Sequence, residues 1–369
     1  MEDDDMTIAI GSPGRYIQGS GELYNLFQIG EHLGKKFFVI ISEGRKKELG
    51  GIIEESLSHG KCEMDVEIFQ GECSMTEINR LTEIAKGKDT EVVVGIGGGK
   101  ALDTAKAVAH FSNARLIIVP TTAAQDAPCL ALSVVYRDDG TLEKYLEYPF
   151  SPDVVLVDSE ICAKAPVRLF ASGMGDGLST FFESRACYAS VTKNGYGYSA
   201  SQNSLMQAKL CYDVIMRDGK AAYLAVKEGL LTNAVENVIE ANVYLSGIGA
   251  EGCGDAGAHG IHNALLILPE IRPFYHGEKV AFGILVQMVL ENAPLTEIEE
   301  ILRFYREVGL PSTLAQLNLE EVSSERMMEV AEYALKDSLQ NEPFELTPKD
   351  VYNAIFAADQ LGQYFIKAL

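Results

Sequence analysis

Three of the six histidines in this chain of 369 residues lie close together, at His259, His262 and His276. His259 and His262 are three residues apart and therefore share one face of a predicted helix, while His276 begins the next one. Two histidines and a carboxylate form a common catalytic metal site, which leaves one coordination position for a substrate. Hydrogen-bonded core histidines, with one exposed histidine at a helix start, would give the same spacing, so both interpretations stand.

Two aspartates have neighbours that suit a functional site. Asp126 lies in PTTAAQDAPCLALSVVY, after a predicted parallel strand, and ligands of α/β proteins bind at the carboxyl ends of such strands. Asp176 lies between glycines in SGMGDGLSTFFESRA, before an amphipathic helix. Each has a purely structural alternative, because aspartate is also common in turns and as the N-cap of a helix.

The segment EVVVGIGGGKALDTAKAVAH predicts a buried strand that runs through three consecutive glycines into a helix opened by Lys100. Glycines let backbone N–H groups approach a diphosphate closely, and a helix N-terminus adds partial positive charge. The segment matches neither the Walker pattern nor the G-x-G-x-x-G dinucleotide fingerprint. Binding of a nucleotide diphosphate is favoured over a plain strand-to-helix turn.

Positioning these residues requires regular elements, and the first ~160 residues alternate between short apolar runs and amphipathic, helix-length segments. The apolar runs are 37–41, 66–69, 92–96, 116–119 and 154–157. This alternation predicts a parallel sheet covered by helices on both faces, and after Pro166 only helical patterns follow. We therefore expect an α/β dinucleotide-binding domain over residues 1–163 and an all-helical domain, which binds metal and substrate, over residues 164–369.

The composition narrows the class of protein. A net charge of -22 disfavours nucleic acid and anionic membranes as partners, because both repel such a chain. Seven cysteines without C-x-x-C spacing suit free thiols in a reducing compartment. The chain has no apolar run of the roughly 20 residues that span a membrane, and its acidic beginning lacks a signal core. We expect a soluble, cytoplasmic protein.

Seven sequence blocks together resemble the glycerol dehydrogenases of the iron-containing alcohol dehydrogenase superfamily. In chain order they are GIGGGKALDTAKAVA, PTTAAQDAPCLALSVVY, DVVLVD, ASGMGDGLSTFFE, AHGIHNAL, FYHGEKVAFG and NAIFAADQ. They extend over almost the whole chain. The resemblance implies a Rossmann-like parallel sheet followed by an all-α domain, the dehydroquinate synthase-like fold, with the active site between the two domains. It also implies a homo-oligomer, since relatives form octamers.

The resemblance assigns the metal ligands. Asp176, His259 and His276 would bind the metal, and His262 would line the site as a catalytic residue without being a ligand. Iron-type relatives carry a further histidine four residues after the aspartate, where this chain has Thr180. This difference implies the zinc-dependent branch.

The resemblance also assigns residues to the coenzyme and the substrate. Asp126 would be a second catalytic residue, which approaches the substrate hydroxyls. The coenzyme would be NAD, with NADP as a possible substitute. The residues expected at the coenzyme are Ser42, Gly97, Gly98, Gly99, Lys100, Asp103, Thr121, Ala124, Leu132 and Tyr136.

Three departures from the family pattern concern substrate and coenzyme. Residues 123–125 (AAQ) lack two hydroxyls that relatives commonly carry, and Ala250 and Asp255 replace a phenylalanine and an apolar residue. Ser42 stands where NAD-preferring relatives have an aspartate for the adenosine ribose. The cations at 45–47 would then hold the 2′-phosphate of NADP, or simply form a solvated helix start.

The expected function is a zinc-dependent transfer of hydride between NAD and a small polyol, with glycerol and dihydroxyacetone as the leading pair. The alternatives are an NADP(H)-dependent reductase of another hydroxyketone or 2-oxo acid, a cyclase similar to dehydroquinate synthase, and a non-catalytic nucleotide-binding module. A phosphorylated substrate would call for several cations near the metal, and only Arg272 and Lys279 lie close in sequence. The three implied metal ligands disfavour a non-catalytic module.

Overall fold

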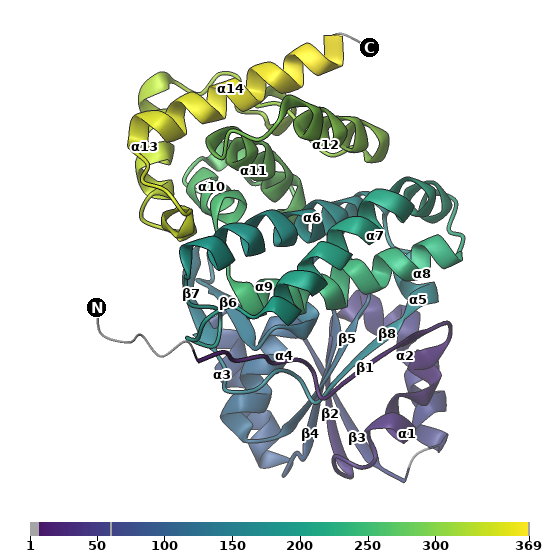
Figure 1. Cartoon of the computed structure of the whole chain (residues 1–369). Helices are drawn as coiled ribbons and strands as arrows, with labels where there is room; N and C mark the ends of the chain where they lie inside the picture. Colours follow the sequence, from purple (N-terminus) through teal and green to yellow (C-terminus); the bar gives the residue numbers. More distant parts are fainter. Residues whose placement is uncertain (1–6, 60, 368–369) are drawn as a thin grey trace. The chain divides into compact units, whose positions relative to one another are not determined.

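The computed structural model describes residues 7–59 and 61–367 (Figure 1). Its backbone contacts divide the chain into two compact units. Gly11–Ala165 and Gly229–Gly247 form the first, called here the sheet unit, and the remaining described residues form the second, called the helical unit.

The sheet unit is built on six parallel strands in the spatial order β1-β8-β5-β4-β2-β3. Along the chain they span Arg15–Gly19 (β1), Lys36–Ile41 (β2), Glu63–Ile68 (β3), Val92–Gly97 (β4), Arg115–Pro120 (β5) and Val154–Asp158 (β8). The predicted parallel sheet is confirmed, and each predicted apolar run lies largely within one of its strands. The edge strand β1 is absent from the sequence prediction, because RYIQG contains few apolar residues.

Helices cover both faces of the sheet, as the apolar runs predict (Figure 1). On one face, Leu49 and Ile53 of α2 (Glu43–His59) belong to the same core cluster as the alternate residues of β2 and β4. On the other face, α4 (Gly99–Ser112) approaches β4 so closely that a Cβ on Gly95 would lie 2.5 Å from the Cβ of Ala105. The unit's other longer elements are α3 (Met75–Gly87), α8 (Asn233–Glu240) and an antiparallel hairpin of β6 (Leu132–Tyr136) and β7 (Leu142–Glu147).

A buried ion pair fastens the β6–β7 hairpin to α4. The ammonium of Lys106, which is 1% exposed, lies 3.0 Å from Oδ1 of Asp103 and donates to the carbonyls of Ala127 and Leu132 at 2.6 and 2.8 Å. The backbone N–H of Val134 donates to the other oxygen of Asp103. Lys106 and Asp103 are both buried, and through these bonds the ion pair fixes the middle of the segment between β5 and β6 and the start of β6.

The helical unit contains no sheet among its described residues. Its helices are α6 (Val167–Ser190), α7 (Gln202–Lys227), most of α9 (Ser246–Cys253), α10 (Gly257–Leu265), α11 (His276–Leu290), α12 (Leu295–Val308), α13 (Ser324–Ala334) and α14 (Pro348–Lys367). No helix in the part of the chain that the structure describes is both long and apolar enough to cross a membrane.

Residues 229–247 follow a helical pattern, and the sequence analysis places them in the helical domain. In the structure they pack within the sheet unit instead, as α8 and the π-helical turn Ala241–Leu245. Two hydrogen bonds join this segment to the rest of the sheet unit. Asn242 donates to the carbonyl of Ala123 at 2.9 Å, and Gln18 donates to Glu236 at 2.6 Å.

Candidate metal centre and coenzyme loop

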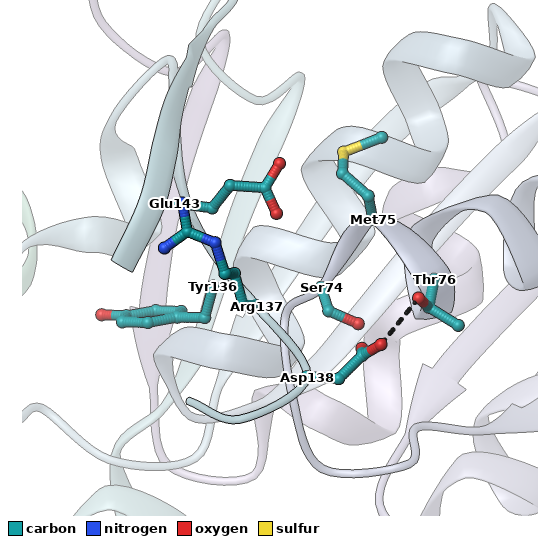
Figure 2. A pocket seen from close by; sticks show the side chains of 7 residues that line it. All are labelled: Ser74, Met75, Thr76, Tyr136, Arg137, Asp138 and Glu143. Atoms are coloured by element: carbon teal, nitrogen blue, oxygen red, sulfur yellow. Dashed lines mark hydrogen bonds between the residues drawn. The ribbon is translucent and has the colours of Figure 1, made fainter. Parts of the chain in front are cut away.

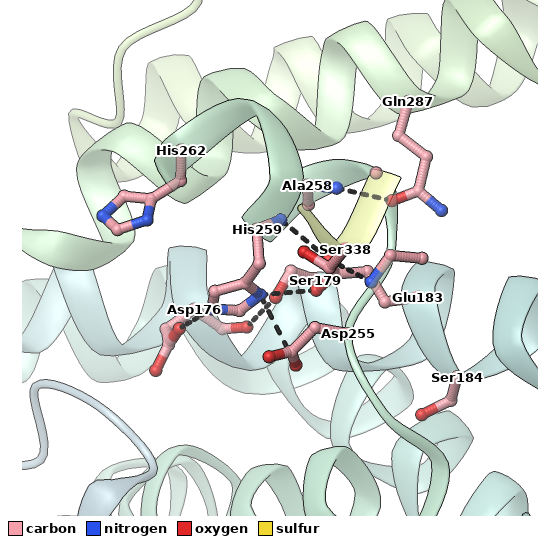
Figure 3. A network of polar contacts seen from close by, with 12 residues as sticks. Asp176, Ser179, Glu183, Ser184, Asp255, Ala258, His259, His262, Gln287 and Ser338 are labelled. Carbon is pink, nitrogen blue, oxygen red and sulfur yellow. Dashed lines mark hydrogen bonds and ion pairs between the residues drawn. The ribbon is translucent and has the colours of Figure 1, made fainter. Parts of the chain in front are cut away.

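Three candidate ligands on three helices of the helical unit come together, and Figure 3 shows two of them, Asp176 and His259. Oδ1 of Asp176 on α6 lies 3.1 Å from Nε2 of His276, the first residue of α11, and 3.6 Å from Nε2 of His259 on α10. The two Nε2 atoms are 3.2 Å apart. Asp176 is 1% exposed and lies in the middle of α6, so its alternative interpretation as a helix N-cap is wrong.

Glycines beside these ligands let the three helices touch at their backbones. A Cβ on Gly175 of α6 would lie 2.4 Å from the carbonyl oxygen of Gly277 on α11, and a Cβ on Gly277 would lie 1.8 Å from that of Ser172. A Cβ on Gly283 of α11 would lie 2.3 Å from the carbonyl oxygen of Ala258 on α10. No other residue type fits these contacts without moving a helix.

Glu183 fixes the orientation of His259. Its Oε2 lies 2.6 Å from Nδ1 of His259, while its Oε1 accepts the backbone N–H groups of Ala256 and His259 at 2.8 and 2.7 Å. The carboxylate can only accept, so Nδ1 carries a proton, and Nε2, which faces Asp176 and His276, is the atom that a metal would bind. Metal-binding histidines usually have this arrangement. The donor set and its fixed tautomer therefore fit a zinc or iron ion.

The charges of this cluster are strongly coupled. Burial alone raises the pKa of Asp176, but the adjacent imidazoles of His276 and His259 hold that pKa well below its usual range. Burial lowers the pKa of His259, whereas the carboxylates of Glu183 and Asp255 raise it, and the net pKa lies well above the usual value. The half-exposed Asp255, whose Oδ1 is 3.8 Å from Nδ1 of His259, thus adds negative charge beside this candidate ligand.

His262 lies beside the three ligands and does not join them. Its ring centroid is 4.5 Å from that of His276, and Figure 3 shows its ring apart from Asp176 and His259. Burial, followed by the positive charges of His276 and Lys279, lowers the pKa of His262 well below its usual value. The ring is therefore neutral and can accept or pass on a proton.

The Gly-Gly-Gly-Lys segment of the sheet unit forms the end of β4 and the start of α4, as predicted. Gly97 ends the strand, Gly98 is the N-cap of α4, and Gly99 and Lys100 form its first turn. The ammonium of Lys100 lies 2.6 Å from the carboxylate of Glu72. A diphosphate at this helix N-terminus would compete with Glu72 for that ammonium.

The segment after β5 lies against this loop. The backbone N–H of Thr121 donates to the carbonyl of Gly97 at 3.0 Å, and the segment continues through Ala124 to Asp126, the N-cap of a 3-10 turn. Gln125 covers the loop directly, because a Cβ on Gly99 would lie 2.0 Å from Nε2 of Gln125. The amide of Gln125 is therefore part of the surroundings of the candidate diphosphate site.

The remaining coenzyme candidates lie at two places in the sheet unit, after β2 and around β6. Ser42 follows β2, and its Oγ accepts the backbone N–H of Arg45 at the start of α2. Leu132 and Tyr136 are the first and last residues of β6, whereas the buried carboxylate of Asp103 is bound by Lys106 as described above.

A pocket of about 320 Å³ opens beside Tyr136 (Figure 2). It is lined by Ser74, Met75, Thr76, Tyr136, Arg137, Asp138 and Glu143, and Thr76 donates to Asp138 across it at 3.0 Å. The ammonium of Lys100 lies 5.1 Å from the centroid of the Tyr136 ring, so the pocket adjoins the Gly-Gly-Gly-Lys segment.

The whole chain is similar to proteins of one family. Residues 13–159 match the model of the iron-containing alcohol dehydrogenases. The chain is 45% identical to a glycerol dehydrogenase of Citrobacter freundii over 363 residues, which are 98% of this chain and 100% of that protein. Crystal structures of a probable glycerol dehydrogenase from Sinorhizobium meliloti 1021 and of the glycerol dehydrogenase from Schizosaccharomyces pombe are also similar. The first has a TM-score of 0.92, 42% identity and coverage of 97% of this chain and 100% of that one. The second has a TM-score of 0.94 and 34% identity, and the match covers 99% of this chain and 93% of that one.

Proposed function

Because the chain belongs to the iron-containing alcohol dehydrogenase family, we propose that it oxidises a small polyol with NAD, most readily glycerol to dihydroxyacetone, at a zinc ion. The observation that carries the proposal is the convergence of Asp176, His259 and His276, with the tautomer of His259 already fixed by Glu183. Sequence similarity to glycerol dehydrogenases over 98% of the chain supports the substrate class.

The helical unit would supply the metal and the proton chemistry. Asp176, His259 and His276 would hold the zinc, which when bound acts as a Lewis acid and makes a substrate hydroxyl easier to deprotonate. His262 stays neutral beside these ligands and would accept that proton. Thr180, one turn after Asp176, offers no imidazole, and the absence of the fourth ligand that iron-type relatives carry there supports zinc over iron.

The sheet unit would hold the coenzyme. Gly98, Gly99 and Lys100 would bind the diphosphate at the N-terminus of α4, where backbone N–H groups and the helix dipole favour an anion. Ser42, Gly97, Asp103, Thr121, Ala124, Leu132 and Tyr136 would surround the rest of the dinucleotide. Asp126 would bind the substrate hydroxyls, and the expected hydride acceptor is NAD, with NADP as a slower substitute.

The location and assembly follow from the same proposal. All seven cysteines are free, which suits the reducing cytoplasm. The net charge of -22 disfavours nucleic acid and anionic membranes as partners. By similarity to its relatives we expect a homo-oligomer.

Initial rates with glycerol, propane-1,2-diol and dihydroxyacetone, each with NAD(H) and NADP(H), test the proposal. Chelation should abolish turnover and zinc should restore it better than Fe(II). His259→Ala should lose the metal, while His262→Ala, a matched loss of one imidazole, should keep the metal and lose turnover. Equal metal loss in both variants, or no polyol turnover with either coenzyme, contradicts the proposal.

A further inference from the structure

Lys279 is a buried cation without a direct partner of opposite charge among the described residues. It lies on α11, three residues and almost one helical turn after His276, and is 9% exposed. Among the described residues, none forms a hydrogen bond or an ion pair with its ammonium. Lys106 shows the usual alternative, since its ammonium is also buried but reaches a carboxylate and two carbonyls. A buried ammonium without acceptors is costly, which makes it a candidate for binding a ligand.

The carboxylate next to Lys279 in sequence is occupied elsewhere. Glu278 receives two hydrogen bonds from the guanidinium of Arg168, at 2.6 and 2.8 Å, and a third from the backbone N–H of Tyr275 at 2.7 Å. Its oxygens are therefore directed toward the start of α11. The negative charge of Glu278 is used to close the helix end and to bind Arg168.

Asn263, the residue after His262, offers the ring of His262 an acceptor and no charge. The amide of Asn263 donates to Asp337 at 2.9 Å, so its oxygen is the atom that lies 2.9 Å from Nδ1 of His262. Nδ1 of His262 therefore carries the proton, and Nε2 keeps its lone pair. The charge of Lys279 helps to keep this ring neutral. Burial lowers the pKa of Lys279 to about 8, so its ammonium still carries the proton near neutral pH.

The two helices thus repeat one spacing. On α10 the ligand His259 is followed three residues later by His262, and on α11 the ligand His276 is followed three residues later by Lys279. Residues with this spacing are neighbours on a helix face. Because α10 and α11 touch at Ala258 and Gly283, and because the charge of Lys279 contributes to the lowered pKa of His262, these two side chains lie near each other beside the three candidate ligands.

We propose that Lys279 binds the second oxygen of the substrate, on the carbon next to the reacting carbon. This inference rests on the proposed function. An alcohol oxygen at the metal centre and a neighbouring hydroxyl or carboxylate at Lys279 would be bound together, so 1,2-diols and 2-hydroxy acids are selected over simple alcohols. Because a hydrogen bond from a charged donor is lost, removing the ammonium should cost such substrates about 10- to 100-fold in kcat/KM.

Three substrates of the same carbon skeleton test this: propan-2-ol has no second oxygen, propane-1,2-diol has a hydroxyl, and lactate has a carboxylate. In Lys279→Met, kcat/KM for propane-1,2-diol should fall about 10- to 100-fold, while the value for propan-2-ol changes less than about threefold. A larger loss with lactate than with the diol would identify an anion as the preferred partner. The same kcat/KM values are measured for Lys279→Gln, a second variant without the positive charge. Lys220→Met, which removes an exposed partner of Glu307, is the matched control.

Binding without turnover gives a second measurement. The dissociation constant of propane-1,2-diol for the metal-loaded enzyme–NADH complex, followed by coenzyme fluorescence, should rise by a similar factor in both Lys279 variants. An unchanged ratio of diol to propan-2-ol activity, with normal metal content and unchanged diol binding, overturns the role of Lys279. If the wild-type enzyme oxidises none of the three alcohols, the proposed function fails, and diol binding to the NADH complex still decides the inference.

Discussion

Oε2 of Glu183 lies 2.6 Å from Nδ1 of His259. Glu183 is on α6, the helix that also carries Asp176, and His259 is on α10. The two carboxylate oxygens of Glu183 face three N–H donors, the backbone groups of Ala256 and His259 and Nδ1 of His259. In Glu183→Gln one of these oxygens becomes an N–H₂ group, which cannot accept. We expect Glu183→Gln to weaken zinc binding about 10- to 100-fold, measured by competition with a chelator. The control is Glu291→Gln, which removes the carboxylate that pairs with Arg185 at the C-terminal end of α11. This variant should bind zinc normally. Equal affinities in the two variants would remove Glu183 from the site.

The buried pair of Lys106 and Asp103 should be essential for stability. Lys106→Met leaves the carboxylate of Asp103 buried without a countercharge, and we expect a loss of about 3–5 kcal/mol in the free energy of unfolding. Lys100→Met removes the exposed pair with Glu72 and should cost less than about 1 kcal/mol. Urea unfolding of both variants checks this, and a similar loss in the two would show that burial of the pair is unimportant.

The start of α2 predicts a relaxed choice of coenzyme. Ser42 offers no carboxylate to the adenosine ribose, and Arg45 is held by Glu48 at 2.6 Å. We expect measurable NADP turnover in the wild type, and Ser42→Asp should raise the preference for NAD about 10- to 100-fold. Glu48→Gln removes the partner of Arg45 and should therefore lower the preference for NAD over NADP. These ratios come from kcat/KM for each coenzyme, and an NAD-only wild type would show that Ser42 does not relax the choice.

Glu342 should lower the stability of the protein as the pH rises from about 4.3 to about 8. Burial, followed by the charges of Glu291 and Glu183, raises the pKa of Glu342 to about 8, against about 4.3 in an unfolded chain. The folded state thus holds this proton more tightly, so the free energy of unfolding falls as pH rises through this range. Glu342→Gln cannot ionise, and relative to wild type it should gain up to about 5 kcal/mol between pH 4, where both side chains are neutral, and pH 9. Thermal unfolding at both pH values measures the difference, and a gain that is independent of pH would refute the assignment.

The sequence predicts well those elements whose burial is complete. VVVGI and VVLV are apolar at every position because helices cover both faces of the sheet, and the glycine run marks the turn into α4. Strand β1 lies at the sheet edge and β7 is largely exposed, so neither has a continuous apolar run that would predict it.

The site could be predicted only in part. Spacing within a helix places His262 beside His259, but it cannot bring His276 or Asp176 to them, because that depends on how three helices pack. Glu183 was missed, although its position seven residues after Asp176, two turns along the same face of α6, is a signal that could have found it. Lys279 shows its importance only in the structure, where its burial and its missing partners become visible.

The contacts of Gly175 and Gly277 have a consequence for how this protein tolerates mutation. Each glycine touches the backbone of the other helix and stands next to a candidate ligand, so a larger residue at either position would first widen the distance between α6 and α11. The many apolar contacts elsewhere along these helices can absorb such a shift more easily than a metal ion can. Mutations at these two positions should therefore give variants that fold but are inactive more often than variants that fail to fold.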